Sequence, residues 1–327
     1  MDLNNYTLLC DFYELTMSNG YFQSNMSEQI CYFDVFYRSV PDRGGFAIAC
    51  GLEAVVEYIN NLRFSDDDIK YLESKNMFSK EFLDYLRNFK FSGDIYAVKE
   101  GSVIFPNEPI MIVKAKTIEA QMIETYILLI LNHQSLIATK TNRIVRVANG
   151  RPVMEFGSRR AQGADAAIFG ARAAYIGGCV GTSGVVQGEK FGIPTMNTMV
   201  HSWVQMFDSE YEAFCEYARQ HPDDCSLVVD TYDTIRSGVP NAIKAFNDIL
   251  APMGKRPVSI RIDSGDVTYL TKKVRKMLDD AGFPDCKIVA SNSLDENIIR
   301  DMILQGAQVD SFGVGERLIT AASNPVF

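Results

Sequence analysis

The chain has 327 residues, of which 47% are hydrophobic and 22% are charged, a composition typical of a globular protein with room for one large barrel or two domains. Its 32 Lys and Arg residues against 41 Asp and Glu residues give a net charge of −9, which argues against a general binder of nucleic acid or of anionic membranes. Basic groups that serve an anionic ligand must therefore be locally clustered.

The sequence predicts neither a signal peptide nor a membrane span. Residues 1–6 lack the basic and then apolar pattern of a signal peptide, and the longest apolar run, Tyr126–Leu131, is too short to cross a bilayer. The seven cysteines are scattered without a C-x-x-C pair, and three histidines offer no visible set of His/Cys metal ligands. We therefore expect a cytoplasmic protein with reduced thiols that binds neither membrane nor nucleic acid.

The first third of the chain predicts a small mixed domain. Large side chains favour a strand over Ile30–Tyr37, and Asp94–Lys116 carries strand-turn-strand patterns. Apolar residues at helical spacing predict helices over Leu52–Leu62, Ser65–Leu72 and Lys80–Phe89. We therefore expect residues 1–116 to form an N-terminal α+β sandwich domain.

A stretch without Gly or Pro, residues 118–147, predicts one long helix with a wide apolar surface. His133 lies on this stretch. For a lone histidine in such surroundings, a packed or capping role is a more common outcome than catalysis.

From Pro152 onward, short apolar runs alternate with amphipathic helices. The runs that we expect to form strands are Val153–Phe156, Gly178–Val180, Thr195–Val200, Leu227–Asp230, Val258–Asp263, Lys287–Ala290 and Gln308–Phe312. This alternation indicates an α/β fold, and specifically an irregular parallel α/β barrel of the TIM-like kind over residues 117–327. A doubly wound open sheet is the alternative.

At or just after the end of each of these runs stand polar or small residues, together with the aromatic Phe156, just before a helix. In a parallel barrel the carboxyl ends of the strands form the active-site face, so we expect these residues to lie together. In chain order they are Phe156 with Arg159 and Arg160, Thr182 with Ser183, His201, Asp230, Arg261 with Asp263, Ser291 with Asn292, and Gly313 with Gly315.

The backbone and the carboxylates of this set suggest a phosphorylated sugar as ligand. Gly313-Val-Gly315 would let backbone N–H groups approach a phosphate at a helix N-terminus. Asp230 and Asp263 are able to bind ribose hydroxyls or a Mg²⁺ ion that accompanies phosphates.

The aromatic and basic residues suggest a flat acidic ring beside that sugar. Phe156 is able to stack on an aromatic ring, while Arg159 and Arg261 are able to neutralise phosphate and carboxylate groups. Structural interpretations exist for single positions, such as a helix cap for Ser291 or a packing role for His201. The joint occurrence favours a binding site.

Several ordered motifs along nearly the whole chain resemble those of nicotinate phosphoribosyltransferases, a type II phosphoribosyltransferase family. The motifs are Asp11–Met17, Glu155–Gly163, Gly181–Ser183, Thr198–Trp203, Asp230–Asp233, Arg261–Asp266 and Phe312–Gly315. The resemblance implies that nicotinate and phosphoribosyl pyrophosphate (PRPP) give nicotinate mononucleotide and pyrophosphate in NAD biosynthesis. It also implies coupled ATP hydrolysis, with Mg²⁺ accompanying PRPP and ATP.

The resemblance further implies how the pyridine ring is held and how ATP is coupled. His201 matches the histidine that becomes transiently phosphorylated. Phe156 matches the residue that stacks on the ring, and Tyr13 the tyrosine that a neighbouring subunit places on the opposite face. A homodimer or higher homo-oligomer follows from this arrangement. Thr182 and Ser183 are also expected to bind substrate.

The remaining roles concern charge. The resemblance implies that Arg159 contacts phosphate, that Arg261 meets the substrate carboxyl group, and that Asp230 and Asp263 lie near ribose, pyrophosphate and Mg²⁺. The residues that match the cradle of the 5′-phosphate are Ser291, Asn292, Gly313 and Gly315. Arg160 has no role assigned by the resemblance.

Ser183 separates an acid substrate from an amide. Related nicotinamide phosphoribosyltransferases carry an aspartate at this position, and an ionised aspartate facing the nicotinate carboxylate would cost about 4 kcal/mol at ~4 Å and an effective dielectric constant of about 20. That energy corresponds to roughly three orders of magnitude in affinity. Ser183 avoids the repulsion, so we expect nicotinate as the substrate.

Three alternatives remain. Nicotinamide phosphoribosyltransferase is the first, and quinolinate phosphoribosyltransferase is weaker because His201 has no use there. The chain stops at Phe327 whereas the family continues, so we expect the C-terminal part of the family to be missing. A non-catalytic nucleotide-binding homologue is therefore the third alternative.

Overall fold

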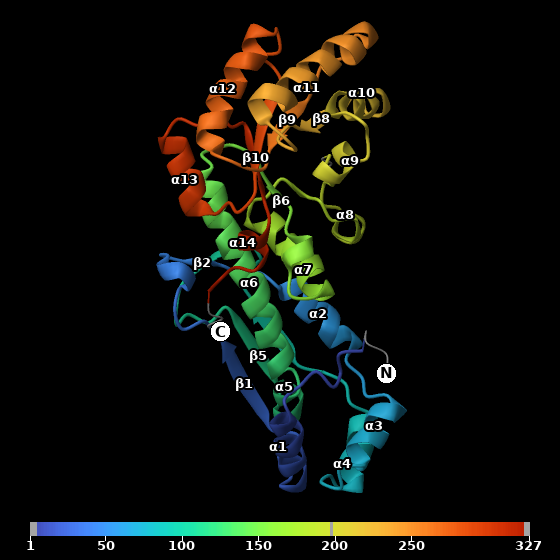
Figure 1. Ribbon diagram of the computed structural model, residues 1–327. Coiled ribbons are helices and arrows are strands. Elements are labelled where there is room, and N and C mark those ends of the chain that lie inside the picture. The colour runs from blue at the N-terminus through green and yellow to red at the C-terminus, as the bar shows by residue number, and fades with distance from the viewer. Residues whose placement is uncertain (1–4, 197–198, 324–327) are drawn as a thin grey trace. The chain divides into compact units, whose positions relative to one another are not determined.

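The structure, a computed structural model, describes residues 5–196 and 199–323. It divides into two compact units, of which the first comprises the chain up to Thr139 together with Ser323, and the second runs over Lys140–Ala322. The division falls inside helix α6 (Glu124–Val147). Figure 1 draws the first unit in blue to green and the second in green to red. The domain boundary expected after residue 116 stays a prediction.

The first unit is built around an antiparallel sheet, which confirms the α+β character expected for this part. Its strand order is β1-β5-β3, from β1 (Ile30–Val35), β5 (Met111–Lys116) and β3 (Asp94–Ala97). Two short strands form a separate antiparallel pair, β2 (Ala47–Ile48) and β4 (Val103–Ile104). The helices are α1 (Phe12–Gln23), α2 (Leu52–Asn61), α3 (Asp66–Glu73), α4 (Lys80–Arg87) and α5 (Thr117–Gln121).

Local sequence explains these elements. Along β5 every second residue, such as Val113, is buried, so one face of the sheet packs on the core. Helix α3 begins at a capping box, in which Ser65 and Asp68 each accept a hydrogen bond from the other's backbone N–H. Phe82 of α4 is fully buried, and a side chain of this size contributes about 1.5–3 kcal/mol when it leaves water.

The long helix predicted over residues 118–147 is two helices, and the single-helix prediction is wrong. Helix α5 ends at Gln121, a turn follows at Met122 and Ile123, and α6 starts at Glu124. The carboxylate of Glu14, on α1, accepts a hydrogen bond from the Thr125 backbone N–H at 3.0 Å. A distant side chain thus caps the new helix, which periodicity in the sequence cannot reveal.

The second unit contains one parallel sheet of six strands in the order β7-β6-β11-β10-β9-β8. This is the circular order of a barrel opened between its second and third strands, and it excludes a doubly wound sheet. The curled half-barrel confirms the predicted α/β class (Figure 1). The strands are β6 (Val153–Glu155), β7 (Gly181–Thr182), β8 (Ser226–Val228), β9 (Ser259–Ile262), β10 (Lys287–Ser291) and β11 (Ser311–Val314).

Helices follow the strands as the alternating pattern predicts. The longer ones are α7 (Ala164–Gly177), α8 (Val185–Phe191), α10 (Glu210–Gln220), α12 (Val267–Asp280) and α13 (Glu296–Leu304). Two short helices, α9 (His201–Gln205) and α14 (Glu316–Ile319), begin directly after Val200 and Gly315. The helix predicted over 241–250 is α11 (Val239–Ala245) followed by a π-helical turn, Phe246–Leu250.

Two of the seven predicted strands differ. The run at 178–180 is not a strand, because Gly178 ends α7 in the left-handed conformation (φ 116°) and β7 begins only at Gly181. In the run at 195–200, Thr195 forms an isolated parallel bridge with Thr182, and residues 197–198 lie outside the described residues.

In the second unit the strands are covered on both faces. Ile260, Ile288 and Phe312 are fully buried on one face, and Arg261 and Ser291 are buried on the other, as expected for a parallel sheet that is covered on both sides. All seven cysteines lie in the described part of the chain and are free thiols. Across residues 5–196 and 199–323, no helix combines the length and the apolar character that a membrane crossing requires.

Candidate active site

A cavity of about 710 Å³ opens in the second unit at the carboxyl ends of the strands. Every predicted site residue lines it except Tyr13, Thr182 and Asp230. The lining residues are Phe156, Ser158, Arg159, Arg160, Ser183, Met196, Val200, His201, Ser202, Arg261, Asp263, Ser291, Asn292, Gly313, Gly315 and Glu316. Predicted residues as far apart in the chain as Phe156 and Gly315 thus line one cavity, because the carboxyl ends of parallel strands share one edge.

Phe156 forms one wall of the cavity. Its backbone N–H donates to the carbonyl of Val314 on β11 at 2.8 Å. Its ring lies over Gly313, where a Cβ atom would come within 2.6 Å of two ring carbons. The glycine therefore has a packing function in addition to any role toward phosphate, because no larger residue leaves room for the ring.

Basic side chains and a tight turn lie elsewhere on the cavity surface. Arg159 and Arg160 lie on a short 3₁₀ turn after β6, and both are solvent-exposed. At the end of β10, Asn292 and Ser293 adopt positive φ angles of 77° and 50°. This left-handed backbone turns the chain sharply at the position predicted to cradle a phosphate.

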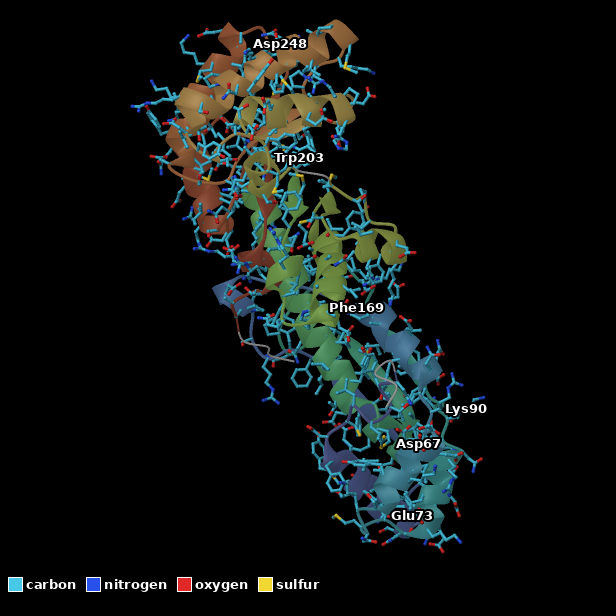
Figure 2. All side chains as sticks on the ribbon, turned by 45° about the vertical axis from the view of Figure 1, so that its right-hand side comes forward. Asp67, Glu73, Lys90, Phe169, Trp203 and Asp248 are labelled. Atoms are coloured by element: carbon cyan, nitrogen blue, oxygen red, sulfur yellow. The ribbon has the colours of Figure 1, made fainter. Side chains whose placement is uncertain are left out.

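His201 is the first residue of α9, and both of its ring nitrogens have polar neighbours. Nδ1 lies 3.1 Å from the hydroxyl oxygen of Thr231. Nε2 lies 3.5 Å from Oδ2 of Asp263 and 3.9 Å from Oδ1 of Asp230. Trp203, labelled in Figure 2, follows on the same helix and donates to the carbonyl of Ala213 at 3.0 Å. The imidazole is therefore held with one nitrogen facing two carboxylates.

Asp230 lies behind the cavity surface, with a side chain that is 1% exposed. Its Oδ2 accepts hydrogen bonds from the Asp263 backbone N–H at 2.8 Å and from the Ser264 hydroxyl at 2.6 Å. Its Oδ1 is buried without a hydrogen-bond partner among the described residues and faces His201. Asp230 thus fixes the turn after β9 and keeps one free oxygen.

Arg261, on β9, is a buried cation that is 8% exposed. Its Nη2 donates to the Met199 carbonyl at 3.1 Å, and its Nη1 lies 3.3 Å from the Ser291 hydroxyl and 3.4 Å from Asp263 Oδ1. The Ser291 hydroxyl in turn donates to Asp263. Nε of Arg261 is buried without a partner in the part of the chain that the structure describes. The guanidinium is thereby fixed in direction.

The carboxylates also bear on the predicted Mg²⁺. No group of three or more His, Cys, Asp or Glu side chains that could hold a metal occurs among the described residues. However, Asp230 Oδ1 and Asp263 Oδ2 both lie on the side of His201 Nε2. Two carboxylate oxygens fit an ion that takes its other ligands from water and substrate phosphates, as Mg²⁺ does.

Thr182 and Tyr13 are not among the residues that line the cavity. Thr182 is fully buried, and its hydroxyl donates to Oε2 of Glu155 at 2.6 Å. Tyr13 belongs to the first unit, where it is 44% exposed and its hydroxyl donates to Glu124 at 2.8 Å. Its placement against a partner's ring site stays a prediction.

His133 also belongs to the first unit. It is half-buried, and burial lowers the pKa of its imidazole. Its Nε2 has no hydrogen-bond partner among the described residues. This environment agrees with a packed side chain.

Sequence reasoning missed some residues of the site. Ser158, Ser202 and Glu316 line the cavity, and each directly neighbours or lies within a motif that was singled out. Glu155 begins the motif Glu155–Gly163, and its sequence position alone assigned it no function, although it is fully buried. An acidic residue within an apolar run that is predicted to be a buried strand is the sequence pattern that could have identified it, because a buried charge needs partners.

Family models match most of the chain. The one described as the nicotinate phosphoribosyltransferase (NAPRTase) N-terminal domain matches residues 8–132, and that of the nicotinate phosphoribosyltransferase (NAPRTase) family matches residues 152–325. The chain is 46% identical over 322 residues to a nicotinate phosphoribosyltransferase of Bacillus subtilis, covering 98% of this chain and 64% of the relative. It therefore spans slightly less than two thirds of that relative's length.

Two further relatives agree. A nicotinate phosphoribosyltransferase of Mycobacterium tuberculosis is 43% identical over 318 residues, covering 97% of this chain and 68% of the relative. The crystal structure of human nicotinic acid phosphoribosyltransferase matches with a TM-score of 0.86 at 27% identity, covering 93% of this chain and 72% of that one. Because the family models cover residues 8–132 and 152–325 and curated relatives are 46% and 43% identical along nearly the whole chain, the chain belongs to the nicotinate phosphoribosyltransferase family.

Proposed function

We propose that the protein is a nicotinate phosphoribosyltransferase, an enzyme that joins nicotinate to PRPP and releases nicotinate mononucleotide and pyrophosphate in NAD biosynthesis. One observation carries the proposal. A single cavity combines an aromatic wall, Phe156, with a fixed buried cation, Arg261, and with His201 beside two aspartates. Each group of the two substrates finds a chemically matched side chain in it.

Nicotinate is a flat ring that carries one negative charge. Phe156 offers a ring face for stacking, and Arg261 offers a guanidinium whose Nε–H has no partner among the described residues. Ser183 lines the same cavity and has a hydroxyl that can donate to a carboxylate. A carboxylate is favoured over an amide as the substrate group, because Ser183 carries no negative charge that would repel the carboxylate.

The transfer develops positive charge on the sugar as pyrophosphate leaves the anomeric carbon. Arg159, the turn at Asn292 and the end of β11 at Gly313 would hold phosphate groups, and positioned reactants are the main requirement for such a displacement. Asp263, with Asp230 behind it, would stabilise positive charge on the ribose. Asp230 and Asp263 would also hold Mg²⁺, which would supply charge neutralisation for the leaving pyrophosphate.

ATP coupling would use His201. Thr231 engages one ring nitrogen and so fixes the imidazole plane, while the other nitrogen faces the two aspartates. A nucleophilic histidine needs this kind of support, because the partner of one nitrogen determines the tautomer at the other. Tyr13 of a neighbouring subunit would complete the ring site, so the active form would be a homodimer or larger homo-oligomer.

A steady-state assay for nicotinate mononucleotide, dependent on PRPP and ATP, tests the function. We expect kcat/KM for nicotinate to exceed that for nicotinamide, and Ser183→Asp to lower the nicotinate value by roughly 10³-fold. Ser202→Ala, at another cavity-lining serine, is the matched control for a change of side chain alone. A preference for nicotinamide contradicts the proposal, and PRPP binding without turnover would indicate a non-catalytic binding protein.

His201→Ala tests the coupling separately. We expect stimulation by ATP to disappear while PRPP still binds, because the phosphate contacts lie on other residues. Incubation with γ-labelled ATP should label the wild type and leave the variant unlabelled. ATP stimulation that persists in the variant would refute the phosphohistidine.

A further inference from the structure

Glu155 is a fully buried acid directly behind the cavity wall, at the carboxyl end of β6. One carboxylate oxygen, Oε1, accepts a hydrogen bond from the Gly157 backbone N–H. The other, Oε2, accepts from the Thr182 hydroxyl at 2.6 Å. Both oxygens of a side chain that touches no solvent are therefore used, and they join the ends of two neighbouring strands.

Thr182 extends this arrangement by one residue. Its hydroxyl oxygen accepts a hydrogen bond from the Gly184 backbone N–H at 3.0 Å. Because the oxygen is already an acceptor there, its own hydrogen is available to Glu155, and the three groups form a continuous chain in one direction. An ionised carboxylate satisfies all the donors at once.

The anchored residues alternate with the residues that line the cavity. Phe156 lies between Glu155 and Gly157, and Ser183 lies between Thr182 and Gly184. The backbone N–H of Ser183 donates to the carbonyl of Glu155 at 3.0 Å, which adds a main-chain link between the two segments. The position of the ring relative to the serine therefore depends on Glu155.

We propose that Glu155 is a positioning residue that sets the distance and angle between the Phe156 ring and the Ser183 hydroxyl. Its partner in this role is Thr182, which acts through hydrogen bonds and has no contact with the ligand. For the identity of that ligand, a pyridine carboxylate, the inference rests on the function proposed above. If the ring and the hydroxyl are misaligned, the carboxylate of the ligand is displaced from its best position, and affinity falls steeply even when every contacting residue is intact.

The test compares Thr182→Val, which keeps the shape and removes the hydroxyl, with Thr182→Ser, which keeps the hydroxyl. Ser259→Ala is the matched control, since the Ser259 hydroxyl is also a buried link between strands, donating to Ser226 at 2.7 Å, but at the amino ends of β8 and β9. Affinities for nicotinate and for PRPP are measured by calorimetry on the full chain.

We expect Thr182→Val to lower the affinity for nicotinate about tenfold or more, while the affinity for PRPP changes by less than about threefold. Thr182→Ser and Ser259→Ala should remain within about threefold of the wild type for both ligands. A parallel loss of both affinities, or a Thr182→Val protein that behaves like Ser259→Ala, overturns the inference. If Thr182→Val does not fold, Glu155→Gln provides the same comparison, because it turns one acceptor into a donor at constant size.

Amide hydrogen exchange separates this inference from the function. If the wild type binds no nicotinate, the proposed substrate is wrong, and exchange of the Gly184 amide still reports on the positioning link. We expect this amide to be protected in the wild type and in Thr182→Ser, and to exchange about 10²-fold faster in Thr182→Val. Equal protection in all three proteins would overturn the positioning role whatever the ligand.

Discussion

Each unit of the molecule buries one glutamate against a threonine, and the two arrangements differ in one respect. In both, a backbone N–H donates to the threonine hydroxyl, and the hydroxyl donates to the glutamate. The groups are Asp11, Thr125 and Glu14 in the first unit and Gly184, Thr182 and Glu155 in the second. In the second unit both carboxylate oxygens are used, whereas in the first both Thr125 donors share Oε1 and the buried Oε2 of Glu14 has no partner among the described residues.

The difference shows what a buried acid needs in order to be a rigid part of the structure. Burial, opposed by the hydrogen bonds from Thr125 and reinforced by the nearby charges of Glu124 and Asp11, raises the pKa of Glu14 from its ordinary value of 4.5 to about 7. Burial also raises the pKa of Glu155, opposed by its hydrogen bonds from Thr182 and Gly157. Glu155, with both carboxylate oxygens bonded, holds the cavity wall in place. Glu14, with one oxygen unbonded, changes its protonation near neutral pH.

The largest effect is expected at Thr182. Thr182→Val leaves the Gly184 N–H and Oε2 of Glu155 buried without partners, which should lower the unfolding free energy of the second unit by about 3–4 kcal/mol. The only tryptophan of the chain, Trp203, lies in this unit (Figure 2), so its fluorescence during denaturation by urea measures the loss. A loss as small as that of an exposed hydroxyl would remove the distinction between the two arrangements.

The next effect concerns Glu14 and depends on pH. The folded state disfavours the charged form, so the stabilising contribution is complete below the unfolded pKa of 4.5 and is lost as pH rises through about 7. Glu14→Gln keeps the acceptor for Thr125 without the charge. It should therefore match the wild type near pH 4 and be more stable by up to about 3 kcal/mol at pH 8. Hydrogen exchange of α1 and α6 amides at both pH values is the measurement, and a difference that is constant with pH would contradict the pKa shift.

The smallest effect is expected at Thr125. This residue is half-buried, and its backbone N–H still reaches Glu14 after Thr125→Val, so we expect a loss of about 1 kcal/mol in the same exchange experiment. Lys276→Gln, which breaks an exposed ion pair with Asp280 on α12, is the baseline and should leave stability unchanged within the error of the measurement. If Thr125→Val lowers the unfolding free energy as much as Thr182→Val does, the number of hydrogen-bonded carboxylate oxygens does not explain the difference between the two units.

Strand order and the carboxyl-end residues could be predicted, because period and chain order carry that information. His201, Arg261 and Asp263 were predicted from their positions at the ends of apolar runs, and the structure places them around one cavity. What the pattern could not give depends on contacts between distant residues. The start of α6 depends on Glu14 from α1, and the functions of Glu155 and Thr182 depend on hydrogen bonds across two strands.

Gly313 illustrates the same limit from another side. A glycine after a strand predicts a tight turn or a close approach to phosphate. Its contact with the Phe156 ring appears only once β11 lies beside β6. The sequence therefore identified the position and could not identify the neighbour that requires it.

The placement of β11 has a consequence for how the chain is made. This strand pairs with β6 on one side and with β10 on the other, although it is the last of the six to be synthesised. Until residues 311–314 leave the ribosome, the sheet can exist only as two separate fragments, β7-β6 and β10-β9-β8, with unpaired inner edges. The nascent chain thus carries an unpaired β6 edge from the synthesis of β6 until β11 emerges, a state that favours chaperone binding and late completion of the fold.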